Sequence, residues 1–125
     1  MTTFYDEIGG METITAIVHR FYEGVAGDEL LRPMYPEEDL GPAEERFRLF
    51  LAQYWGGPTT YSEERGHPRL RMRHAPFEVT PTAAVHWLKH FKDGLESVGL
   101  SDEHADQFWD YVTHAAQFMV NTPEG

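Results

Sequence analysis

Apolar side chains recur along this chain at the spacing of an amphipathic helix almost from end to end. In residues 14–25 they fall at i, i+3, i+4 and i+7, which places them on one helical face. Comparable stripes occupy residues 43–55, 81–98 and 102–119, and no segment argues convincingly for a strand. The pattern therefore predicts an all-α fold with four substantial helices and a short N-terminal one.

Glycine, proline and capping residues mark where these helices are expected to begin and end. Gly9-Gly10 ends the N-terminal helix and permits a sharp turn, and Gly56-Gly57-Pro58 stops the helix before it. Thr80-Pro81 and Ser101 each begin a helix, because their hydroxyl groups can accept from free backbone N–H groups. Residues 58–76 are left as a long connection with one or two short helical turns. A connection of this length in a compact domain is usually functional or disordered, and its apolar residues favour a folded, functional segment.

The stretch GHPRLRMRHAPF, residues 66–77, is strongly basic within an acidic chain. The sequence carries 21 acidic residues against 10 lysines and arginines, with a formal net charge of -11. Such a surface repels phosphate, so we expect no nucleic-acid partner. The local arginine cluster is better suited to a small anion.

Length and composition restrict the number of domains, the kinds of metal site and the expected location of the protein. A chain of 125 residues is expected to form one domain, residues 1–125. It has no cysteine, which excludes disulfides, zinc–cysteine sites and iron–sulfur clusters. The absence of cysteine is also compatible with the cytosol, so we expect a cytoplasmic protein. The N-terminus lacks the features of a signal peptide, and no apolar run is long enough to span a bilayer, so no membrane partner is expected.

Two histidine patterns suggest metal binding only weakly. His86 and His90 lie four residues apart on one predicted helix, but no third ligand is suggested nearby, so a solvated or partly solvated helix face is the better interpretation. Glu64 and His67 have the spacing used by di-iron helical bundles, but Gly66 and Pro68 disfavour the helix that this motif needs.

His74 is the stronger candidate for a metal ligand. It follows a possible helical turn and is cut off by Pro76, so its imidazole is held firmly. A neutral imidazole is a good axial ligand for haem iron, and arginines beside it suit the two propionates. Spacing alone favours a structural histidine; the arginine cluster shifts the balance towards a ligand. Elsewhere Tyr22, Tyr35 and Trp87 offer two phenols and an indole N–H that could converge on one small ligand, although each is also a reasonable core residue.

Taken together, these residues resemble the truncated haemoglobins, and specifically group II, which has a tryptophan in the pocket. The resemblance covers nearly the whole chain and rests on FYDEIGG, VHRFYEGVAGDELLRPMYPEEDL, AEERFRLFLAQYWGGPTTYSEERGHPRLRMRHAPF and the helix with Trp87. It implies a truncated globin fold, a two-over-two helical sandwich around haem b (iron protoporphyrin IX). The two Gly-Gly turns look like the glycine signatures of this family.

The resemblance also implies roles for individual positions. His74 matches the proximal iron ligand, and Tyr22, Tyr35 and Trp87 match distal residues that hydrogen-bond the ligand. Ala43 falls where many globins have a distal histidine, so this pocket would lack one. The other residues implied to contact haem, the last three of them near the propionates, are Phe47, Phe50, Arg46, Tyr61 and Arg71. Phe47 is bulkier than the leucine or glutamine expected in close relatives, which leaves the size of the distal cavity open.

The expected function is binding of dioxygen at haem iron, with NO, CO, peroxide and sulfide as further small ligands. An alternative is a haem enzyme, either a peroxidase or a nitric-oxide dioxygenase, and it would need an external reductase because the sequence carries no flavin or nicotinamide domain. A ferric-state binder of sulfide or other anions and a haem-free helical bundle are further alternatives. A homodimer is typical of the group, but no isolated apolar stripe demands one.

Overall fold

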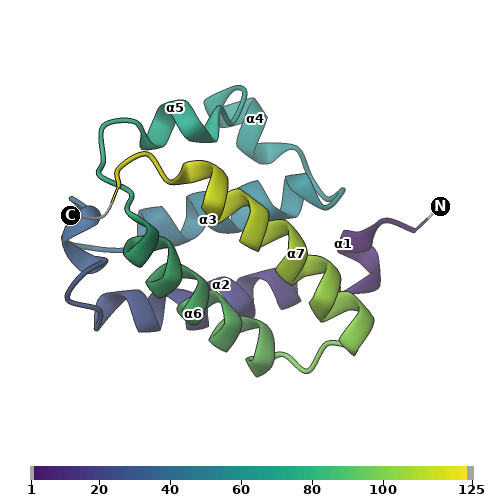
Figure 1. Ribbon diagram of the computed structural model, residues 1–125. Helices are drawn as coiled ribbons and strands as arrows, with labels where there is room; N and C mark the ends of the chain where they lie inside the picture. Colours follow the sequence, from purple (N-terminus) through teal and green to yellow (C-terminus); the bar gives the residue numbers. More distant parts are fainter. Residues whose placement is uncertain (1, 124–125) are drawn as a thin grey trace.

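The computed structural model describes residues 2–123, and within that range it contains helices and no strand (Figure 1). The elements in chain order are α1 (Phe4–Glu7), α2 (Gly10–Ala26), the 3-10 helix η1 (Arg32–Met34), α3 (Gly41–Tyr54), α4 (Thr60–Arg65), α5 (Leu70–His74), α6 (Pro81–Ser97) and α7 (Asp102–Met119). The predicted all-α fold is thus confirmed. None of the helices in the described range is long and apolar enough to cross a membrane.

Most helix ends lie where the sequence places them, and side-chain caps explain why. Thr80 accepts from the backbone N–H of Ala83 at 3.1 Å, and Ser101 accepts from that of His104 at 3.2 Å. Gly9 has φ 107°, a left-handed conformation that favours glycine and allows the turn between α1 and α2. One boundary differs from the prediction. Helix α3 begins at Gly41 and not near residue 43, because Pro42 fits the first helical turn.

The core lies mainly between α2 and α6, which make the most extensive helix–helix contact; α3 packs on α2 and α7 packs on α6. Six residues of α2 are buried, and they form the predicted apolar stripe: Ile14, Ile17, Val18, Phe21, Tyr22 and Val25. Gly94 permits the close approach, because a Cβ at this position would lie 2.6 Å from the carbonyl oxygen of Ile17. The four long helices are therefore centred on α2 and α6, with α3 packed on α2 and α7 packed on α6.

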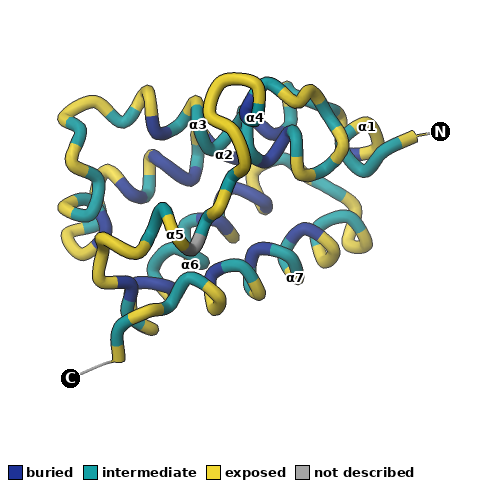
Figure 2. Tube along the Cα trace, turned by 90° about the horizontal axis from the view of Figure 1, so that it is seen from above, coloured by how far each residue is buried: buried dark blue, intermediate teal, exposed yellow. Residues whose placement is uncertain are grey.

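The connection between α3 and α6 is folded, as predicted, and its two helical turns are α4 and α5. Figure 2 shows that residues 63–69 and 75–78 are almost entirely exposed, unlike the long helices. The guanidinium group of Arg73 holds this segment together by donating to the carbonyl oxygens of Arg65, His67 and Pro68. The segment presents His74 at the last position of α5.

Candidate functional site

Three predicted distal residues come from separate parts of the chain and meet in one hydrogen-bonded cluster. Tyr22 lies on α2, Tyr35 follows η1 and Trp87 lies on α6. The side chains of Tyr22 and Trp87 each lie close enough to that of Tyr35 to change its pKa, and the hydroxyl of Tyr22 donates to the carbonyl oxygen of Ala43. The two phenol ring centroids lie 5.7 Å apart at an interplanar angle of 80°. The structure thus brings together the three residues that the sequence proposed as distal donors.

The surroundings keep both phenols protonated. Burial raises the pKa of Tyr22, and the neighbouring Tyr35 raises it further by its charge and by accepting a hydrogen bond. Burial is also the main reason that the pKa of Tyr35 is raised, although hydrogen bonds from Tyr22 and Trp87 partly oppose the effect. A protonated phenol keeps its O–H donor, so the cluster presents hydrogen-bond donors at neutral pH.

Phe47 and Ala43 complete the apolar part of this cluster. The Phe47 ring packs against four other rings, with centroid distances of 5.4 Å to Phe21, 5.7 Å to Trp87, 6.0 Å to Phe91 and 6.3 Å to Tyr22. Phe47 therefore lies in the middle of the aromatic cluster, among residues of α2 and α6. Ala43 is buried, and its carbonyl oxygen accepts from the Tyr22 hydroxyl at 3.5 Å.

On the other side of the molecule, His74 is oriented by its own helix. Its Nδ1 lies 2.7 Å from the carbonyl oxygen of Leu70, which can only accept, so Nδ1 carries the proton. That tautomer leaves Nε2 with a free lone pair, the form in which imidazole binds a metal. The half-buried imidazole thus fits the predicted ligand role.

The predicted propionate partners are only partly brought together. Arg46 and Tyr61 line one cavity of about 290 Å³ between α3 and α4, together with Arg65 and the acidic Glu45 and Glu64. Arg46 is paired with Glu37 at 2.8 Å, so it would have to leave that carboxylate to bind another one. The side chain of Arg71 lies outside the part of the structure that is described.

The buried Tyr61 ring is the centre of a second aromatic group near this cavity. Phe50 packs on it with ring centroids 5.6 Å apart. The guanidinium carbons of Arg65 and Arg73 each lie 5.9 Å from the Tyr61 ring centroid. Arg73 also binds three backbone carbonyl oxygens, so its position serves the fold of the segment, and it was not singled out for this role from the sequence.

With this geometry established, comparison with known proteins decides the family. The sequence matches the bacterial-like globin family over residues 3–121. The chain belongs to this family. It is 42% identical over 120 residues to Group 2 truncated hemoglobin YjbI of Bacillus subtilis, covering 96% of this chain and 89% of that protein.

Solved globin structures agree with this assignment. A thermostable haemoglobin from the actinobacterium Thermobifida fusca is 58% identical, with a TM-score of 0.96 over 98% of this chain and 100% of the other. The structure described as truncated oxygen-avid haemoglobin from Bacillus subtilis is 41% identical, with a TM-score of 0.90 over 96% of this chain and 100% of the other. The predicted membership of the group II truncated haemoglobins and the predicted truncated globin fold are both confirmed. Globins use haem and bind small gaseous ligands such as dioxygen.

The residues of this globin chain fit haem in their chemistry. His74 on α5 offers a bare Nε2, and Tyr22, Tyr35 and Trp87 on other elements offer donor groups. Aromatic side chains that are only half-buried, including Phe47 and Phe50, provide apolar surface for a flat macrocycle. An axial imidazole, apolar walls and polar groups for a small ligand are the features that such a cofactor requires.

Two residues of this globin that matter for the site were missed in the sequence. The side chain of Asn121 accepts from Val79 N–H at 2.9 Å and donates to the carbonyl oxygens of His74 and Phe77 at 3.3 and 3.0 Å. It therefore ties the residues that follow the candidate iron ligand to the end of α7. Only the position of an asparagine just after a predicted helix could have hinted at such a role. The second residue is Asp28, in the turn after α2.

The expectation for His86 and His90 was wrong in part. The side chain of His86 is 41% exposed, as a partly solvated face requires, but that of His90 is only 11% exposed. Both histidines donate to the carboxylate of Asp28, at 3.0 and 2.7 Å. His90 is less exposed than His86 because its ring packs over Gly24, where α2 and α6 approach each other. Among the described residues no group of three or more histidine, aspartate or glutamate side chains is arranged to hold a metal ion.

Proposed function

We propose that the protein binds dioxygen and other small ligands such as NO, CO and sulfide at the iron of haem b. His74 is the iron ligand in this proposal, and Tyr22, Tyr35 and Trp87 hydrogen-bond the ligand on the opposite face. The haem, when bound, supplies the iron at which the small ligand is held. The relative from Bacillus subtilis that is described as oxygen-avid is consistent with this function.

The observation that carries the proposal is the convergence of three aromatic donors from three separate segments, one of them buried and two half-buried. The side chains of Tyr22 and Trp87 both lie beside that of Tyr35, so the donor groups of three segments are within reach of one small ligand. A partly negative small ligand is stabilised by such fixed donors, because they need no reorganisation when it binds.

The other residues have supporting roles. Phe47 and Ala43 exclude water from the donors, which strengthens their hydrogen bonds to a ligand. The bond from His74 Nδ1 to Leu70 fixes the imidazole ring so that Nε2 faces the cofactor. Arg46 and Tyr61, which share a cavity, are the described candidates for the propionate edge.

The proposal is tested by replacing Trp87 with phenylalanine, which removes the indole donor and keeps an aromatic ring. A hydrogen bond to an acceptor with negative charge contributes about 1.5–3 kcal/mol, so dioxygen should dissociate roughly 10–150 times faster. Stopped-flow measurement of dioxygen dissociation gives the rate, and Tyr22→Phe and Tyr35→Phe complete the set. Unchanged rates in all three variants would remove the donor cluster from the proposed role.

The competing proposal is an enzyme that acts on peroxide or nitric oxide with electrons from an external reductase. It predicts turnover, whereas a binding protein predicts only saturable, reversible spectral changes. Steady-state consumption of peroxide with a phenolic donor, and of nitric oxide by the dioxygen-loaded protein with a reductant, distinguishes the two. Sustained turnover that is lost with the donors would favour the enzyme.

A further inference from the structure

Asp28 is an almost buried carboxylate that is saturated with hydrogen-bond donors. Its side chain is 9% exposed. It accepts from His86 Nδ1 at 3.0 Å and from His90 Nε2 at 2.7 Å. Its other oxygen accepts from the backbone N–H groups of Leu30 and Leu31 at 2.9 and 3.0 Å. One carboxylate thus joins two parts of the chain that are about 60 residues apart in sequence.

Each of the two segments that Asp28 joins carries one of the distal donors. On α6, His86 and His90 stand on either side of Trp87, one residue before it and three residues after it. Anchoring both histidines to one carboxylate therefore fixes the position of α6 along its axis, and its rotation about that axis, next to the indole of Trp87. Burial by itself raises the pKa of Asp28, but the bonds from His90, Leu31, His86 and Leu30 outweigh it and hold the pKa well below its usual range. The carboxylate is consequently charged, and it binds the histidine N–H groups strongly.

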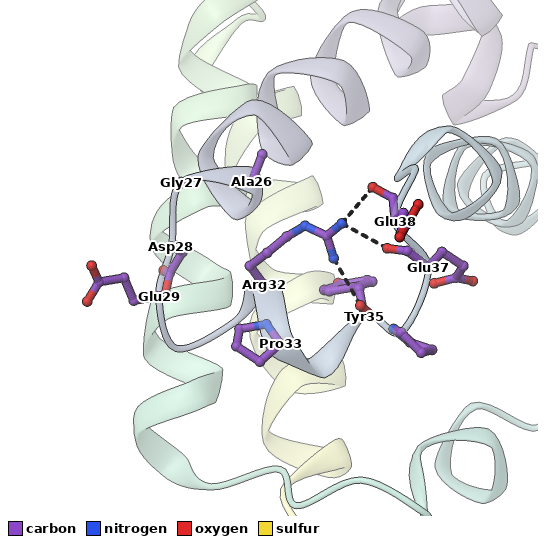
Figure 3. A pocket seen from close by; sticks show the side chains of 10 residues that line it. Ala26, Gly27, Asp28, Glu29, Arg32, Pro33, Tyr35, Glu37 and Glu38 are labelled. Atoms are coloured by element: carbon purple, nitrogen blue, oxygen red, sulfur yellow. Dashed lines mark hydrogen bonds between the residues drawn. The ribbon is translucent and has the colours of Figure 1, made fainter.

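The other part of the chain leads to Tyr35. Asp28 fixes the turn that precedes Leu31, which is buried in the core. Arg32 then donates to the carbonyl oxygen of Tyr35 at 2.9 Å and to those of Glu37 and Glu38, both at 2.8 Å. Figure 3 shows these three bonds converging on one guanidinium group in a cavity of about 550 Å³, with Asp28 also on its wall. Residues 28–38 are therefore held as one unit from Asp28 to the tyrosine.

Close packing at His90 leaves little room for α6 to move relative to α2. A Cβ on Gly24 would lie 2.2 Å from His90 Nδ1, so the ring of His90 rests directly on the backbone of α2. That Nδ1 atom is buried without a hydrogen-bond partner, while Nε2 of the same ring faces Asp28 and donates to it. The hydrogen bond between His90 and Asp28 is thus enclosed between α2 and α6.

We propose that Asp28 is a positioning residue of the distal pocket, which holds α6 against residues 28–35 and so keeps Trp87 and Tyr35 within hydrogen-bonding distance. It does not touch the small ligand. This inference rests on the proposed function, because it concerns the same donor cluster. It adds a residue that lies outside the cluster and acts on it through His86, His90 and the turn before η1.

Asp28→Asn is the variant that tests the proposal, because it keeps the shape of the side chain and removes its charge and half of its acceptor capacity. Dioxygen dissociation from the haem-loaded protein should become roughly fivefold faster, about the effect of weakening one hydrogen bond. Amide hydrogen exchange should increase in residues 28–38. The indole N–H resonance of Trp87 in the CO-bound protein should shift. Glu7→Gln is the matched control, because it neutralises the carboxylate of another histidine pair, Glu7 with His104 at 3.2 Å, which joins α1 to α7.

A double-mutant cycle separates positioning from general destabilisation. In a Trp87→Phe background, Asp28→Asn should change dioxygen dissociation by less than about 1.5-fold, because the donor on which it acts is gone. A full effect in that background, or an unchanged indole resonance in Asp28→Asn, would overturn the proposal. If Asp28→Asn does not fold, His86→Phe takes its place, since it removes one of the two anchors and leaves His90 bound. If Trp87→Phe, Tyr22→Phe and Tyr35→Phe all leave the rate unchanged, the proposed donor role fails, and the exchange and resonance measurements still decide whether Asp28 positions the indole.

Discussion

The two sides of the candidate haem site are built in different ways. The distal side lies on long, buried helices that meet at glycines, with Gly24 under His90 and Gly94 against Ile17. The proximal side lies on the short helices α4 and α5 and on exposed connections (Figure 2). There, discrete bonds from side chains to backbone carbonyls, made by Arg73 and Asn121, take the place of close helix packing.

Because of this difference, different kinds of substitution should disturb the distal and the proximal side. Steric changes at the glycines should disturb the distal side, because packed helices have no space into which to move. Loss of single polar side chains should disturb the proximal side, because few apolar contacts replace the lost hydrogen bonds. The following predictions test that comparison.

The largest effect is expected from His74→Gly, which removes the proposed iron ligand. Haem should no longer be held in its histidine-ligated form, and added imidazole should restore the spectrum by occupying the vacated space. Visible absorption spectra with and without imidazole check this outcome. His114→Ala, an exposed histidine on α7, is the control and should leave the spectrum unchanged. A normal histidine-ligated spectrum in His74→Gly would contradict the proximal assignment.

Gly94→Ala should break the contact between α2 and α6. The new methyl group meets a backbone oxygen, which cannot rotate away as a side chain can. Overpacking of this kind typically costs 1–3 kcal/mol, more than the roughly 1 kcal/mol gained from the better helix propensity of alanine. Chemical denaturation gives the free energy of unfolding. In Gly27→Ala the new methyl group has open space, with the nearest atom 4.0 Å away, so stability should be nearly unchanged.

Asn121→Ala should weaken the proximal side selectively. It leaves the N–H of Val79 and two carbonyl oxygens without their side-chain partner, which costs about 1–2 kcal/mol. Haem should dissociate faster, while the rate of dioxygen dissociation should change little. Transfer of haem to an excess of apomyoglobin measures the first rate, and stopped flow measures the second. The exposed Gln117, one turn earlier on α7, provides the control Gln117→Ala. Equal effects on both rates would contradict the separation of the two sides.

The smallest effect is a pH dependence that belongs to the distal side. The pKa of Asp28 is lowered in the folded protein, so its contribution to stability is fully present above the ordinary carboxyl pKa and is lost as the pH falls below it. Relative to Asp28→Asn, the wild type should lose about 1 kcal/mol of stability between pH 5 and pH 3. The facing groups, His86 and His90, are present in both proteins, so the difference isolates the carboxylate. A constant difference over this range would show that Asp28 is not tied to the histidines.

Local sequence signals predicted much of the fold and part of the site. The apolar period located the long helices, Thr80 and Ser101 marked helix starts, and the segment before Pro76 was correctly expected to be folded. His74 could be selected because its position between a short turn and a proline is itself a local feature. The exposure of His90 was predicted wrongly, since helical spacing gives the face of a residue and not what lies opposite that face.

The sequence by itself determined the helices, their caps and the candidate ligands, because each of these depends on residues within one or two helical turns. Only the tertiary structure decided that Asp28 meets His86 and His90, and that Asn121 meets the backbone after His74. Those contacts join residues that are 47 to 62 positions apart. They exist because α2 and α6 approach closely at glycines and because α7 ends beside α5, and these are distances between helices that no local pattern encodes.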